Sequence, residues 1–111
     1  MEDKLIKYEK IILTLLEEFA EAWSNEIKQA SVVADTKRKH YQLLNIGWQG
    51  SSYLFYVSCH FSIKNGKVWI QENRTDVVLA DELVERGIPK SDIVLGLKHP
   101  NVRPHTGFAV A

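Results

Sequence analysis

The sequence is poor in cysteine, methionine and proline, with one, one and three of them among 111 residues. A single thiol, Cys59, cannot form an internal disulfide and is not a zinc signature, so we expect a protein of the reducing cytoplasm. Apolar runs are also short, and none approaches the roughly 20 residues that span a bilayer. The charged start of the chain also lacks the apolar core of a signal peptide. We therefore expect no membrane association.

Net charge is absent as well, since 14 Lys and Arg residues balance 14 Asp and Glu residues. A protein that binds DNA strongly by itself is normally basic, because neutralised phosphates supply most of the affinity. We therefore expect DNA to be contacted only weakly or indirectly, although this balance leaves room for a local basic patch.

The composition that remains is that of an ordinary globular protein, 45% hydrophobic and 25% charged. A chain of this length can bury one hydrophobic core without the help of metals or disulfides. We predict one domain over residues 1–111.

Apolar residues recur at steps of three and four near the start of the chain, which predicts an amphipathic helix. Its lysines come early and its glutamates late, so both groups oppose the helix dipole. Packing rather than charge must therefore hold this helix. The apolar stripe consists of Leu5, Tyr8, Ile11, Ile12, Leu15, Leu16, Phe19 and Trp23.

The apolar period then changes to two, which predicts four antiparallel strands joined by short turns. The Asn-Gly turn at 65–66 is typical of a type I′ hairpin, and it places Phe61 opposite Ile70 and His60 opposite Gln71. The predicted strands cover residues 29–36, 41–48, 52–64 and 67–72.

Strict alternation divides the side chains of the last hairpin between two faces. The second face is too aromatic to be fully hydrated, so we expect the tail of the chain or a partner to cover part of it. The core face is predicted to carry Tyr53, Phe55, Val57, Cys59, Phe61, Ile63, Val68 and Ile70. The second face is predicted to carry Leu54, Tyr56, Ser58, His60, Ser62, Trp69 and Gln71.

A second helix is predicted over 79–84, ended by Gly87 in the left-handed conformation. A short buried strand over 93–97 follows, and Pro100 and Pro104 favour an extended tail. The expected fold class is α+β, with an N-terminal helix, a four-stranded antiparallel meander, a second helix, a short C-terminal strand and an extended tail.

The residue types that carry catalysis or bind metals are present, but not in the required spacing. The histidines His40, His60, His99 and His105 form no i, i+4 pair on a helix, and Cys59 is predicted to face the core, where a thiol lacks a neighbouring base. No serine lies in a nucleophile elbow, and no glycine-rich loop cradles phosphate. We predict no catalytic, cofactor-binding or metal-binding residue, and no cofactor.

The run Lys37, Arg38, Lys39 and His40 is the only dense basic segment. On a hairpin turn it could contact phosphates. The alternative, which we favour, is a charged turn that blunts a sheet edge.

Three later residues complete the candidate contacts with a partner or a nucleic acid. Trp69 belongs to the aromatic second face. Arg103 is the one charge placed to fix the tail, through an acid or through carbonyl groups, and Phe108 is expected to anchor the tail on the domain.

Several segments together resemble the XisI family of cyanobacteria, named for the fdxN element excision controlling factor. The resemblance covers almost the whole chain, and the last two segments are its most specific parts. The turn Thr36-Lys37-Arg38-Lys39 departs from the family, which usually has a more acidic segment there. The segments that carry the resemblance are DTKRKHYQLLNIGW, KNGKVWIQENRTD, ADELVERGIPKSDIVLGL and HPNVRPHTGFAVA.

The resemblance implies a controlling factor that works with a nuclease-like companion, XisH, so that a recombinase excises a DNA element during heterocyst development. It implies no catalytic residues. Our leading hypothesis is thus a non-enzymatic accessory protein that binds a XisH-like partner. The first rival is a DNA-binding module that uses the basic turn and Arg103. A small hydrolase using His60 or His99 ranks last. An edge strand or the aromatic face offers a surface for a homo-oligomer.

Overall fold

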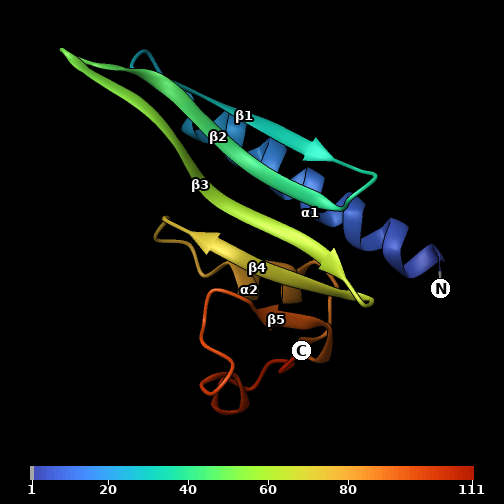
Figure 1. Ribbon diagram of the computed structural model, residues 1–111. Coiled ribbons are helices and arrows are strands. Elements are labelled where there is room, and N and C mark those ends of the chain that lie inside the picture. The colour runs from blue at the N-terminus through green and yellow to red at the C-terminus, as the bar shows by residue number, and fades with distance from the viewer. Residues whose placement is uncertain (1) are drawn as a thin grey trace.

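The computed structural model describes residues 2–111, and Figure 1 shows how its helices and strands are arranged. All five strands belong to one sheet in the order β1-β2-β3-β4-β5, with β1 to β4 antiparallel and β5 parallel to β4. The predicted α+β class is confirmed. The elements are α1 (Glu2–Trp23), β1 (Lys28–Asp35), β2 (His40–Gln49), β3 (Ser52–Lys64), β4 (Lys67–Asn73), α2 (Leu79–Glu85) and β5 (Ile93–Leu95).

The helix α1 lies along one face of the sheet, behind β1 and β2 in Figure 1. Its predicted apolar stripe is the face that it buries, with Ile12, Leu15 and Leu16 fully enclosed. The short helix α2 covers the same core near β4 and buries Leu79 and Leu83. Neither α1 nor α2 lies on the opposite face of the sheet, which we call the open face.

A polar cluster fastens the start of α1 to the segment that leads into β5. The Nζ atom of Lys4 lies 2.9 Å from Oδ2 of Asp92, and the Tyr8 hydroxyl donates to the same oxygen. Burial by itself raises the pKa of Asp92, but the hydrogen bonds from Tyr8 and Lys4 outweigh burial and hold the pKa below its ordinary value. The side chain of Asp92 therefore stays ionised and joins residues far apart in the sequence.

Two turns that the sequence predicts are confirmed in detail. Asn65 and Gly66 both have positive φ, 54° and 75°, as a type I′ turn requires. At the end of α2, Gly87 has φ of 109° and the Ile88 N–H donates to the Leu83 carbonyl, the hydrogen bond of a Schellman motif.

The strand register departs from strict alternation at two β-bulges. Along β2 and β3, Leu43 pairs with Cys59 while Leu44 pairs with Val57, so Ser58 is an extra residue on β3. A second irregularity lies between β3 and β4. The predicted pairing of Phe61 is correct, but that of His60 is wrong.

The second bulge makes Gln71 the extra residue on β4. Phe61 pairs with Ile70 as predicted, whereas His60 pairs with Glu72 instead of Gln71. A bulge places two residues opposite one, so the side chains beyond it exchange faces.

The predicted faces of β3 are therefore correct on one side of Ser58 and wrong on the other. Cys59, Phe61 and Ile63 belong to the core as expected. Before the bulge, Tyr53 and Phe55 are exposed on the open face, and Tyr56 turns to the helix side, where its hydroxyl accepts from Lys28. Nothing in the sequence marks Ser58 as the residue where the exchange occurs.

The tail lies beside β5 and packs on its own domain. The Ala109 N–H donates to the Ile93 carbonyl at 2.8 Å, and Ala109 bridges Val94 in parallel. Phe108 packs against the core as predicted. The tail is not extended throughout, because Arg103–His105 forms one 3₁₀ turn with Pro104 in its first positions, where the missing N–H costs nothing. The strand β5 also ends earlier than predicted.

None of the helices within residues 2–111 is both long enough and apolar enough to cross a membrane.

Candidate interaction surface

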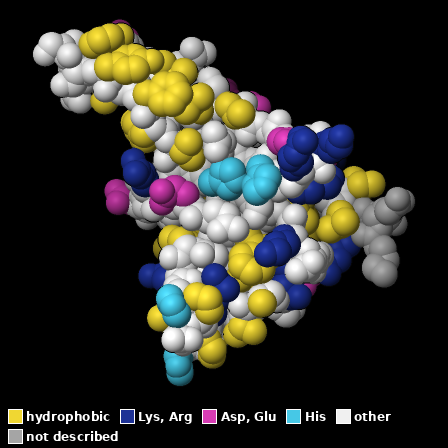
Figure 2. All heavy atoms as spheres, in the orientation of Figure 1, with side chains coloured by type: hydrophobic (Ala, Val, Ile, Leu, Met, Phe, Trp, Pro, Cys, Tyr) yellow, Lys and Arg dark blue, Asp and Glu magenta, His cyan; other side chains and the backbone are white. Residues whose placement is uncertain are grey.

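Four apolar side chains lie exposed where β2 and β3 meet, at the end of the open face. They are Ile46, Trp48, Tyr53 and Phe55, with exposed fractions of 41%, 59%, 55% and 61%. We call these four residues the hairpin surface. In Figure 2 the apolar side chains gather at this end of the molecule, which the β2–β3 hairpin forms in Figure 1.

The hairpin surface is built from cross-strand pairs. Trp48 pairs with Tyr53, and Ile46 pairs with Phe55. The ring centroids of Trp48 and Tyr53 are 4.9 Å apart and those of Tyr53 and Phe55 are 6.4 Å apart. These contacts hold the aromatic rings in one continuous surface. The bulge at Ser58 is the reason that Tyr53 and Phe55 join Trp48 on this face.

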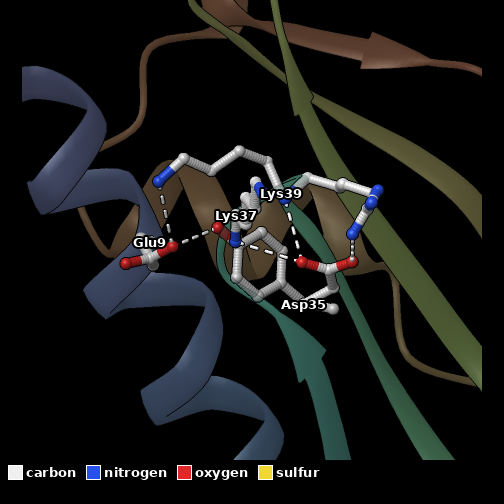
Figure 3. Close-up of polar contacts among 6 residues, drawn as sticks. Glu9, Asp35, Lys37 and Lys39 are labelled. Carbon is white, nitrogen blue, oxygen red and sulfur yellow. Dashed lines mark hydrogen bonds and ion pairs between the residues drawn. The ribbon is translucent and has the colours of Figure 1, made fainter.

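The basic turn lies at the opposite end of β2 and is tied to acids of its own chain (Figure 3). The Asp35 carboxylate accepts the backbone N–H groups of Lys37 and Arg38, and Arg38 Nη1 lies 3.3 Å from it. The hydrogen bond from the Arg38 backbone is the largest contribution that lowers the pKa of Asp35. The Asp35 carboxylate therefore binds the backbone of Lys37 and Arg38 and the side chain of Arg38.

Lys39 completes the turn and has φ of 63°, in the left-handed region. Its Nζ reaches Glu9 of α1 at 3.4 Å, and the Tyr41 hydroxyl donates to the same carboxylate (Figure 3). Within the described part of the chain, Lys37 takes part in no ion pair. The structure thus uses Arg38 and Lys39 to close the turn and to attach it to α1.

The other three candidate contacts are Trp69, Arg103 and Phe108, and they lie around β4 and the tail. The guanidinium of Arg103 lies 5.2 Å from the Trp69 ring centroid, and Lys64 Nζ lies 5.0 Å from it. Trp69 is only 8% exposed beneath this cover. Arg103 also donates to the carbonyls of Lys98, Gly96 and Val110. The structure therefore brings Trp69 and Arg103 together. The basic turn instead contacts Asp35 and Glu9.

Two histidines meet in the middle of the open face, between the hairpin surface and the tail (Figure 2). Nδ1 of His40 lies 3.0 Å from Nε2 of His60, and Nδ1 of His60 lies 2.8 Å from Oε1 of Gln42. Burial, followed by the nearby His40, lowers the pKa of His60. By contrast, His99 accepts the Asn101 N–H with its ring and stabilises a turn of the tail.

The lone cysteine has the predicted surroundings. Cys59 is buried in the core, and burial raises the pKa of its thiol to about 11. A thiol with this pKa is protonated at neutral pH and is a poor nucleophile.

A hollow of about 400 Å³ opens on the helix side, between the end of α1 and the segment after β4. The buried Ser58 hydroxyl faces no hydrogen-bond partner among the described residues. The rest of the lining is mixed polar and aromatic and contains Trp23, Lys28, Tyr56, Arg74, Thr75, Asp76 and Val77.

Fold and surface together define a class of protein: a small α+β domain whose sheet is covered by helices on one face and displays clustered aromatic side chains on the other. Residues 1–110 match the model of the family described as XisI protein. The chain belongs to the XisI family.

Two solved structures from Anabaena variabilis ATCC 29413 are similar to the chain over nearly its whole length. A XisI-like protein has 42% sequence identity and a TM-score of 0.90, and the alignment covers 96% of this chain and 99% of that one. The fdxN element excision controlling factor XisI has 32% identity and a TM-score of 0.83, with 97% and 99% covered. No curated protein matches the sequence.

Proposed function

We propose that the protein is a non-enzymatic accessory factor that controls excision of a DNA element, and that it binds a XisH-like protein through the hairpin surface. Membership of the XisI family and the likeness to an excision controlling factor support the process. The observation that carries the binding role is the hairpin surface itself.

The physical argument starts from the rings of Trp48, Tyr53 and Phe55, each more than half exposed. Burying such a side chain in an interface yields about 1.5–3 kcal/mol, and tryptophan and tyrosine are enriched among the residues that dominate binding energy. Cross-strand contacts between the rings stabilise the hairpin by about 1 kcal/mol or less, which is below the yield of burial in an interface, and adjacent exposed rings are typical of an interaction site. The hairpin surface is therefore the preferred docking surface.

The charges favour a protein over DNA as the direct ligand. The formal net charge is zero. Arg38 and Lys39 form ion pairs with Asp35 and Glu9, so a phosphate would compete with acids already in place.

The test is co-purification of the chain with a XisH-like protein under native conditions, at fixed concentrations of both. Replacement of Trp48 and Phe55 by alanine is expected to weaken retention by at least 10-fold, as the loss of two central aromatic contacts does. The matched control replaces Ile6 and Val78, which are 64% and 61% exposed, and is expected to retain the partner.

Two outcomes contradict the proposal. One is equal retention by the Trp48/Phe55 and Ile6/Val78 variants. The other is a salt-dependent shift of duplex DNA by the isolated chain that disappears when Lys37, Arg38 and Lys39 are replaced by alanine, because this shift would assign the ligand to the basic turn.

A further inference from the structure

We propose that His40 and His60 form a two-histidine site for a divalent transition-metal ion, and that its geometry fits Cu²⁺ or Ni²⁺. The two imidazoles come from neighbouring strands on the open face. Gln42 pairs with His60 in the β2–β3 register, and His40 is two residues before Gln42. The ring centroids are 5.2 Å apart, and the facing nitrogens are 3.0 Å apart.

The tautomer of His60 is fixed by Gln42. An amide oxygen only accepts hydrogen bonds, so the 2.8 Å contact with Gln42 Oε1 requires a hydrogen on Nδ1 of His60. The lone pair of His60 is then on Nε2, the atom that faces His40. A histidine that donates its remote N–H to an oxygen acceptor is the usual arrangement around a bound metal, because it orients the ring and raises its basicity.

The separation of the nitrogens is compatible with two ligands at a right angle around one ion. With metal–nitrogen bonds of about 2.0–2.1 Å, two ligands at a right angle are about 2.9 Å apart, and two ligands of a tetrahedron are about 3.3 Å apart. The separation of 3.0 Å between His40 Nδ1 and His60 Nε2 is that of a hydrogen bond in the metal-free pair, and it is also close to the spacing of the right angle. Both rings must turn so that the two lone pairs meet at one ion. Right-angled nitrogen ligands are typical of tetragonal Cu²⁺ and Ni²⁺.

Metal binding requires the shift of one hydrogen and a turn of both rings. His40 donates from Nδ1 to His60 in the metal-free pair, and it would carry its hydrogen on Nε2 when Nδ1 binds the ion. His40 is exposed, so solvent can exchange this hydrogen.

The chain itself supplies two ligands. No group of three or more His, Cys, Asp and Glu side chains placed to hold a metal occurs among the residues searched within 2–111. Glu72, the register neighbour of His60, already accepts the Asn73 N–H at 3.1 Å and lies 3.6 Å from Arg74 Nε. The remaining positions of the ion therefore face solvent, where water or a donor from a bound molecule completes them.

The experiment titrates the full chain, free of any histidine tag, with CuCl₂ and follows binding by electron paramagnetic resonance and calorimetry. We expect one equivalent of Cu²⁺ with a spectrum of at least two imidazole nitrogens. His40→Ala and His60→Ala are each expected to weaken binding at least 10-fold. The control His99→Ala/His105→Ala is expected to bind as the unaltered chain does.

A second measurement separates ligand loss from unfolding. Bound Cu²⁺ should protect His40 and His60, but not His99, from carbethoxylation in the unaltered chain. Gln42→Leu is expected to lower affinity about 10- to 100-fold, as loss of an outer-shell hydrogen bond does, and Gln42→Glu is expected to restore it. Unchanged binding by the His40 and His60 variants, or equal modification of all four histidines with and without Cu²⁺, overturns the proposal.

Discussion

Trp48 and Trp69 lie on the same face of the sheet, and their surroundings are opposite. Trp69 is 8% exposed, because Lys64 and Arg103 lie over its ring and the tail passes beside β5. Trp48 is 59% exposed at the far end of the same face. The protein's own tail therefore covers one end of the open face, and the other end is exposed.

The covered end of the open face contributes to stability, whereas the hairpin surface is suited to binding. At the covered end, side chains are held by contacts that form on folding. At the hairpin surface, the same kind of side chain contacts its cross-strand neighbours and leaves more than half of its area available to a second molecule.

Replacement of Trp69 by alanine should lower the free energy of unfolding by about 3–5 kcal/mol, as removal of a large buried side chain does. The same substitution at Trp48 is the matched comparison. Urea unfolding of both variants measures the contrast. Equal losses at the two positions would show that the tail does not cover Trp69 in solution.

Removal of residues 107–111 should lower the free energy of unfolding by about 2 kcal/mol, because it removes the half-buried Phe108 and the hydrogen bond from Ala109. Thermal melting of the isolated chain checks this expectation. An unchanged melting temperature together with loss of association would mean that another chain, rather than the protein's own sheet, covers the tail.

Asp92→Asn should cost about 1 kcal/mol at neutral pH, since it weakens a charge-assisted contact with Lys4 and Tyr8. The pKa of Asp92 is lowered on folding, so its contribution is present above the pKa of an unfolded Asp, about 3.9. The contribution disappears as the pH falls through the folded pKa. Unfolding measured from pH 7 to pH 2 should show a smaller loss in the variant, and identical profiles would contradict this assignment.

Trp48→Ala and Phe55→Ala should change the free energy of unfolding by no more than about 0.5 kcal/mol, as exposed substitutions normally do. This is the smallest effect expected in urea unfolding. A loss of 2 kcal/mol or more at either position would mean that the hairpin surface is packed within the isolated chain.

The sequence predicts those parts of the fold that depend on neighbouring residues. The stripe of α1, the turn at Asn65 and Gly66, and the end of α2 at Gly87 each have a local physical cause, and each is confirmed. Phe108 also anchors the tail as predicted.

The hairpin surface escaped prediction because it depends on a single extra residue. Ser58 resembles any other serine in a strand, yet its bulge reverses the faces of Tyr53 and Phe55. The pairing of His40 with His60 escaped for a related reason, since 20 residues separate them and only the β2–β3 register brings them together. The Arg103 contact with Trp69 likewise joins distant segments.

The contact between Tyr8 and Asp92 has a consequence for the order of events during synthesis. The two residues are 84 positions apart, so a ribosome must add most of the sheet before α1 can gain this contact. The Glu9 contacts with Lys39 and Tyr41 become available much earlier. A growing chain can therefore first attach α1 to the β1–β2 turn, and the link to Asp92 forms only when the segment leading into β5 emerges.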